Sequence, residues 1–142
     1  EEYGYESQVR ENLTRLLLLI GDGRPQMLME NAEKYRRYNE RTKQMLTFIK
    51  RHFGEELSVR DIADSASISE SECLRCFRKI LDTSPIAYLK TYRLQRAAEL
   101  LETTSRKVSD IAAQCGFGEM SYFAKSFREI YRCTPSQYRS RT

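Results

Sequence analysis

The chain has 142 residues, of which 40% are hydrophobic and 31% charged, a balance that suits one compact domain with a polar surface. Its longest apolar run, residues 16–20, is far shorter than the ~18 residues of a membrane span, and there is no secretory signal pattern. The net charge of +4 is unevenly spread, because residues 1–40 carry −2 and residues 41–142 carry +6. The basic part therefore suits a polyanionic partner.

The first 40 residues predict a helical segment and a linker. Residues 5–20 place five apolar side chains on one helical face: Val9, Leu13, Leu16, Leu17 and Ile20. This patch is too apolar to stay exposed, so we expect it to pack on the basic part or to pair with a second copy of the chain. Gly21–Pro25 ends the helix, and residues 26–40 are interpreted as a linker that becomes helical towards its end.

Three helices are predicted between residues 41 and 81. The first, Arg41–Phe53, has apolar residues at helical spacing and stops at Gly54. The second is Val59–Ser65, and the third runs from its cap, Ser69, to about residue 81. Ser69 and Glu72 have the spacing of a capping box, in which each side chain satisfies a backbone N–H of the first turn.

A long helix is predicted next, at Pro85–Thr103, where proline is favourable as the first helical residue. It spans about 28 Å at ~1.5 Å per residue. Its apolar face consists of Ile86, Leu89, Tyr92 or alternatively Arg93, Leu94, Ala97, Leu100 and Leu101. Lys90, Arg93, Arg96 and Glu99 are expected on the more solvent-exposed sides of the helix.

The sequences on the two sides of this helix are related. Residues 59–63 recur 49 positions later, and residues 77–88 recur 50 positions later. The second copy predicts helices at Lys107–Cys115 and Glu119–Tyr131, then a short helix that Thr134 caps. A duplicated unit of about 50 residues indicates two copies of one supersecondary structure. Each copy is a short helix, a tight turn and a longer helix, so the sequence predicts an all-α fold with two helix-turn-helix units.

The cysteines allow two interpretations. Cys73-x-x-Cys76 has the spacing of a zinc or redox pair, but the chain has no second close pair and a single histidine. Both cysteines fall inside a predicted helix, and Cys73 and Cys115 occupy apolar core positions of the repeat. We therefore expect free thiols that pack as small hydrophobes in a reducing cytosol, and no cofactor or metal.

Four motifs carry a family resemblance. They are Tyr88-Leu-x-x-x-Arg93-Leu-x-x-Ala97-x-x-Leu-Leu101, Asp110-Ile-Ala-x-x-Cys-Gly-Phe117, Ser121-Tyr-Phe-x-x-x-Phe-Arg128 and Thr134-Pro-x-x-Tyr-Arg139. In this order and spacing they resemble the DNA-binding domain of AraC/XylS-type bacterial transcription regulators. The resemblance covers residues 41–141 and implies seven helices, with the long helix joining the two units. Residues 1–40 then correspond to the end of an upstream sensing and dimerisation domain.

The resemblance also implies which residues read DNA bases. By position they are Ser71, Leu74 and Arg75 in the first unit, and Met120, Ser121, Ala124 and Lys125 in the second. Arginine suits guanine, whereas Leu74, Met120 and Ala124 suit thymine methyl groups. Two departures from the family pattern are Ser67, where the turn expects glycine, and Cys73, where the core expects leucine. We expect the first turn to be slightly strained or differently shaped, and the first core to be weaker.

Seven further cations are predicted to contact DNA phosphates: Arg60, Arg78, Lys79, Arg93, Arg96, Lys107 and Arg128. For any one of them, plain solvation is an equal alternative. Arg75 and Arg128 are expected to differ in role. The first lies early in its helix and should read a base, while the second lies where the helix has risen towards the backbone and should hold a phosphate.

The sequence thus predicts a cytoplasmic bacterial transcription regulator that binds DNA sequence-specifically. Because the ~28 Å helix approaches the ~34 Å turn of B-DNA, two recognition helices would enter successive major grooves of promoter DNA. RNA polymerase and, through the N-terminal helix, a second copy of the chain are further expected partners. A protein-interaction module on the same scaffold is the alternative. An enzyme is not expected, since the chain shows no nucleophile–base pair, HExxH motif or phosphate-binding glycine loop.

Overall fold

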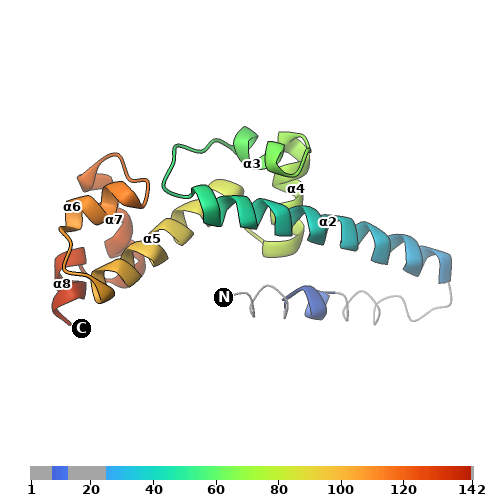
Figure 1. The fold of residues 1–142 in the computed structure, drawn as a ribbon. Helices are drawn as coiled ribbons and strands as arrows, with labels where there is room; N and C mark the ends of the chain where they lie inside the picture. Colours follow the sequence, from blue (N-terminus) through green and yellow to red (C-terminus); the bar gives the residue numbers. More distant parts are fainter. Residues whose placement is uncertain (1–7, 13–24, 142) are drawn as a thin grey trace. The chain divides into compact units, whose positions relative to one another are not determined.

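A computed structural model describes residues 8–12 and 25–141 (Figure 1), and these residues form helices and loops without any strand, which confirms the all-α prediction. Residues 8–12 are helical. The later elements are α2 (Pro25–His52), α3 (Val59–Ser65), α4 (Glu70–Leu81), α5 (Pro85–Thr103), α6 (Val108–Gln114), α7 (Met120–Tyr131) and α8 (Pro135–Ser140). Within the described ranges, no helix combines the length and apolarity needed to cross a bilayer.

The chain divides into two compact units, each with one helix-turn-helix. The first contains α2 as far as Phe48 together with Val59–Pro85. The second contains Ile49–Ser58 and the chain from Ile86 onwards. Helices α3, α5 and α8 begin where the sequence predicted, and the others that were predicted after residue 54 begin within one residue of their expected starts.

Helix α2 corrects the prediction for residues 26–53. The expected linker and the expected separate helix form one continuous helix of 28 residues. Neither glycine nor proline interrupts the chain between Pro25, at the helix start, and Gly54 beyond its end. One buried position is polar, but the Thr42 hydroxyl donates a hydrogen bond of 2.7 Å to the Tyr38 carbonyl within the helix. A polar residue is therefore tolerated in the buried stripe.

The apolar face predicted near the N-terminus is described only in part. Val9 is buried and shares a surface pocket with α2 residues Ala32, Tyr35, Arg36 and Asn39. The other four members of that face, Leu13, Leu16, Leu17 and Ile20, lie outside the described residues. Its pairing with a second copy, or its packing on the basic part, stays a prediction.

The core of the first unit comes mainly from α2, α3 and α4. Its fully or nearly fully buried apolar residues include Met45, Ile62, Ala63, Cys73, Cys76, Phe77 and Ile80.

The N-terminal cap of α4 differs from the prediction. Ser69 Oγ accepts a hydrogen bond of 3.1 Å from the Glu72 backbone N–H, as expected, but the Glu72 carboxylate turns to two arginines instead of completing a capping box.

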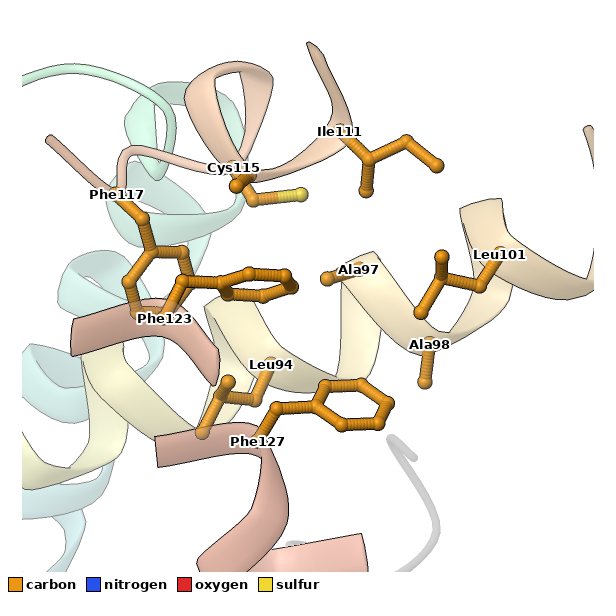
Figure 2. Close-up of a cluster of buried hydrophobic side chains, with 10 residues drawn as sticks. Leu94, Ala97, Ala98, Leu101, Ile111, Cys115, Phe117, Phe123 and Phe127 are labelled. Carbon is orange, nitrogen blue, oxygen red and sulfur yellow. The ribbon is translucent and has the colours of Figure 1, made fainter. Parts of the chain in front are cut away.

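The core of the second unit is assembled around α5 (Figure 2). Four residues of α5 face aromatic rings from the turn and α7: Leu94, Ala97, Ala98 and Leu101 against Phe117, Phe123 and Phe127. Small residues in the middle of α5 leave room for these rings.

Helix α8 is capped by Thr134, as predicted, within a complete capping box that Gln137 closes.

Helix α5 departs from its predicted apolar face at both margins. Ile86 was placed on the buried face but is 45% exposed. Arg96 was expected on a polar side, and Arg93 either there or, in place of Tyr92, on the apolar face; both are half-buried. An arginine can bury the stem of its side chain while its guanidinium donates hydrogen bonds.

The four cysteines are free and buried, which confirms the predicted core positions of Cys73, Cys76 and Cys115. Burial raises the pKa of Cys73, Cys76 and Cys115 to about 11. These thiols therefore stay protonated at neutral pH and behave as small apolar side chains.

Candidate nucleic-acid interface

The turns of the two units have the same backbone geometry. In the first, the Ser67 N–H donates to the Asp64 carbonyl at 3.0 Å and the Ile68 N–H to the Ala63 carbonyl at 3.2 Å. In the second, Gly116 and Phe117 make the corresponding hydrogen bonds, at 3.1 and 2.9 Å. Ser67 has φ +55° and Gly116 has φ +89°, so both turns use a left-handed residue at this position. The first turn is thus not differently shaped, although a non-glycine residue is strained there.

The turn of the second unit is covered, unlike that of the first. A Cβ atom added at Gly116 would lie 2.7 Å from Arg93 Nε and 2.8 Å from the Phe53 carbonyl oxygen. Ser67, in contrast, is exposed. Glycine is therefore needed in the second turn for space as well as for its φ angle, whereas the first turn asks only for the φ angle.

The predicted base-reading residues gather at the N-terminal half of each second helix. In α4, Ser71, Leu74 and Arg75 are all exposed, and Leu74 presents 46% of its surface. Their spacing of three and four residues places them on one face. That face is opposite the buried side, which carries Cys73 and Phe77.

Helix α7 brings together the corresponding residues of the second unit. Met120, Ser121 and Lys125 are exposed and Ala124 is half-buried. Tyr122, which we did not predict as a site residue, is 50% exposed beside them, and Lys90 Nζ lies 5.2 Å from the centre of its ring. The sequence did contain a signal for Tyr122, namely a large aromatic residue in the exposed first turn of a predicted recognition helix.

Arg75 belongs to a small charged network. Its Nη1 lies 2.9 Å from Glu72 Oε2, and Arg41 Nη1 from α2 lies 3.2 Å from Glu72 Oε1. The Glu72 side chain is only 24% exposed, so these ion pairs are partly shielded from solvent. Glu72 therefore anchors a candidate base-reading arginine to α2, a connection that the sequence reasoning missed.

Five of the predicted phosphate contacts are exposed: Arg60, Arg78, Lys79, Lys107 and Arg128. Arg78 forms a 3.6 Å ion pair with Asp82 at the end of α4. Lys125 and Arg128 line a shallow groove with Glu129 and Arg132. This groove joins a candidate base-reading residue to a candidate phosphate contact on the same helix.

The other two predicted phosphate contacts, Arg93 and Arg96, already have protein partners. Arg93 donates hydrogen bonds of 2.7 Å to the carbonyls of Phe53 and Glu55. Burial lowers the pKa of this guanidinium, and the carbonyl oxygens offset part of the cost of desolvation. Arg96 pairs with Glu99 at 2.5 Å and lies over the Phe53 ring. The phosphate role of these two residues stays a prediction. Their observed contacts instead fix Phe53 and Glu55, in the segment that follows α2.

Comparison with known proteins places this arrangement in a family. A family model described as a helix-turn-helix domain matches residues 62–141, more than half of the chain. The chain is 36% identical over 101 residues to the uncharacterized HTH-type transcriptional regulator YdeC of Bacillus subtilis. It is 33% identical over 125 residues to the HTH-type transcriptional activator RhaS of an Enterobacter species. These matches cover 71% and 88% of this chain, but only 35% and 43% of the relatives.

Solved structures give the same answer at the level of the domain. An AraC-type regulator from Chromobacterium violaceum is 30% identical with a TM-score of 0.68, and the match covers 71% of this chain and 90% of that one. The DNA-binding domain of AdpA, solved in complex with a target DNA, is 28% identical with a TM-score of 0.66, over 69% of this chain and 88% of that one. This chain belongs to the AraC-type family of helix-turn-helix DNA-binding domains.

Proposed function

We propose that this chain is the DNA-binding part of a transcription regulator, and that α4 and α7 enter successive major grooves of promoter DNA. The observation that carries the proposal is the duplication itself. Two turns with the same hydrogen bonds each present a helix whose exposed N-terminal half holds side chains that suit base edges. The likeness to the AdpA domain, which was solved with a target DNA, supports the same function.

Each unit would contribute differently to recognition. Arg75 in α4 would read guanine, with Leu74 against a thymine methyl group, whereas α7 would rely on Met120, Ala124 and Lys125. The exposed cations Arg60, Arg78, Lys79, Lys107 and Arg128 would contact phosphates and fix the register of the domain on the duplex.

The chain spans about a third of the length of the first curated relatives, so its role in a whole regulator is also a proposal. We propose that residues 1–40 connect the domain to an upstream sensing part and support pairing of two copies. We further propose that the regulator works in the bacterial cytoplasm, that it contacts RNA polymerase at the promoter, and that it has no enzymatic activity of its own.

Selection of bound fragments from a random pool of duplexes tests the proposal, followed by hydroxyl-radical footprinting on the enriched sequence. We expect enrichment of one motif and protection of roughly two turns of the duplex by one chain. A footprint confined to one half-turn would show that only one unit docks. The absence of any enriched motif would favour a protein-interaction module instead.

A further inference from the structure

Helix α2 carries a basic face that continues the surface of the first recognition helix. Lys34, Arg37 and Arg41 lie three and four residues apart, so they share one side of α2. We call these three residues the α2 basic face. Together with the buried Tyr38 they line an open groove of about 230 Å³, whose opposite wall is formed by Glu72 and Arg75 of α4. In Figure 1, α4 lies beside the middle of α2 within this unit.

Glu72 ties the two walls of the groove together. Its two carboxylate oxygens bind Arg41 from α2 and Arg75 from α4, at 3.2 and 2.9 Å. Arg75 also stands among the exposed residues that are proposed to read bases. The α2 basic face therefore begins at the edge of the DNA-facing surface of α4 rather than on a remote part of the unit.

The charge of the groove is unbalanced. Four cationic side chains line it against one carboxylate, and that carboxylate is already shared by Arg41 and Arg75. Lys34 and Arg37 are exposed, and in the part of the chain that the structure describes neither has an ion-pair partner within 4.0 Å. Glu30 and Glu33 precede them by one turn on α2 and are exposed, but they form no ion pair with Lys34 or Arg37 within 4.0 Å. Two cations without an ion pair beside a recognition helix favour an extended anion.

We propose that the α2 basic face binds the phosphate backbone of the same duplex that α4 reads, on the strand that flanks the bases next to Arg75. The inference rests on the proposed function and extends it to residues upstream of the helix-turn-helix. Lys34 and Arg37 would each neutralise a phosphate, while Arg41 would hold α2 against α4 through Glu72. Phosphate contacts fix orientation without reading sequence, so this face would strengthen binding and leave base preference unchanged.

The structure offers a matched control on the same helix. Arg36 and Lys43 are exposed and lie about half a turn of the helix away from the α2 basic face. Arg36 borders a different pocket, with Val9, Ala32, Tyr35 and Asn39. The variants K34Q/R37Q and R36Q/K43Q therefore remove one lysine and one arginine each, from opposite sides of α2. Arg41 is left intact in both, because its loss would disturb Glu72 and Arg75.

Both variants and the unaltered chain are titrated with the selected duplex between about 50 and 200 mM salt. Each lost phosphate contact lowers the slope of log K against log salt by about 0.9. We expect K34Q/R37Q to lower the slope by about two units and to weaken binding at least roughly tenfold. The control variant should keep the original slope. Phosphate ethylation interference should also identify positions beside the first unit that matter for the unaltered chain but not for K34Q/R37Q.

The outcomes separate this inference from the proposed function. If the unaltered chain binds the duplex specifically and K34Q/R37Q keeps its slope, the α2 basic face does not touch DNA and the inference alone is overturned. Equal losses in both variants would also overturn it, because they would reflect net charge rather than one face. If the unaltered chain selects no duplex, both the inference and the proposed function fail. Circular dichroism of the variants checks that these exposed substitutions leave the helices formed.

Discussion

The two helix-turn-helix units share a backbone turn but differ in what surrounds it. The left-handed residue of the first turn, Ser67, is exposed. Its counterpart, Gly116, lies under the Arg93 guanidinium and the Phe53 carbonyl. The same φ requirement is therefore met by serine where the turn is open and by glycine where it is covered. The environment of a turn, and not only its backbone angle, decides whether glycine is needed.

The recognition helices differ in a related way. The first turn of α4 contains Glu70 and Glu72, and its exposed Arg75 is held by a carboxylate. Helix α7 begins instead with Met120, Ser121 and Tyr122, without any acidic residue in its first turn. If both units bind DNA, the first should depend on charge and hydrogen bonds, and the second more on apolar and stacking contacts.

The largest expected effect comes from giving the second turn the residue of the first. Gly116→Ser places a Cβ atom within 2.8 Å of the Phe53 carbonyl and of Arg93, at a φ angle of +89°. The clash falls on the hydrogen bond between those two residues, so its relief requires movement of the segment after α2. We expect the free energy of unfolding of the second unit to fall by about 3 kcal/mol. Urea denaturation followed by circular dichroism measures it.

Gly118→Ser is the matched control. No heavy atom lies within 4 Å of the Cβ position there, and its φ angle is not in the left-handed range. We expect a change within about 0.5 kcal/mol. Equal losses for the two glycine variants would mean that neither the atoms packed over Gly116 nor its φ angle contributes to stability.

The second prediction concerns base reading in the first unit. Arg75→Ala should cost about 1–3 kcal/mol of binding to the preferred duplex and should flatten the preference at one base pair. Its repeat counterpart, Lys125, lacks the planar fork of arginine, so Lys125→Ala should cost less and change preference less. Affinities on matched and singly mismatched duplexes measure both. An intact preference at every base pair in Arg75→Ala would contradict the assignment of Arg75.

The third prediction sets Arg128 against Arg75. Arg128 is exposed near the end of α7, where it borders a groove with Lys125 and Arg132. Arg128→Ala should weaken binding to all duplexes by about 1 kcal/mol and lower the salt slope by about one unit. The same salt series on preferred and unrelated duplexes measures this. A change in base preference, rather than a uniform loss, would show that Arg128 reads sequence.

Much of this fold could be predicted from repeated local signals. The bounds of α3 and α5, the cap of α8 and the buried cysteines follow from caps, proline and apolar spacing, which act over one or two helical turns. The first half of α2 was interpreted as a linker because it buries little: among the side chains of residues 27–40, Tyr38 alone is buried, so no apolar stripe marks the helix. The Glu72 network was missed for another reason, since it joins residues 31 positions apart in the sequence. The candidate base-reading residues were located by position in a motif, and their roles stay predictions.

Repetition in sequence also did not predict equal burial. Ile80 is fully buried, whereas Ile130, its counterpart 50 residues later, is 47% exposed. A repeat copies the local pattern of a helix, but burial depends on which other elements cover that pattern.

The smallest expected effect is the reverse exchange, Ser67→Gly. An L-residue in the left-handed region costs about 1 kcal/mol or slightly more, and glycine removes this cost. Glycine also gains freedom in the unfolded chain, which offsets roughly half of that benefit. Because Ser67 is exposed, no packing is lost. We therefore expect the first unit to be stabilised by about 0.5 kcal/mol, measured by urea denaturation beside Gly116→Ser. Destabilisation by Ser67→Gly would show that the serine side chain stabilises the first unit by more than its backbone strain costs. The two turns would then differ in more than the atoms packed over them.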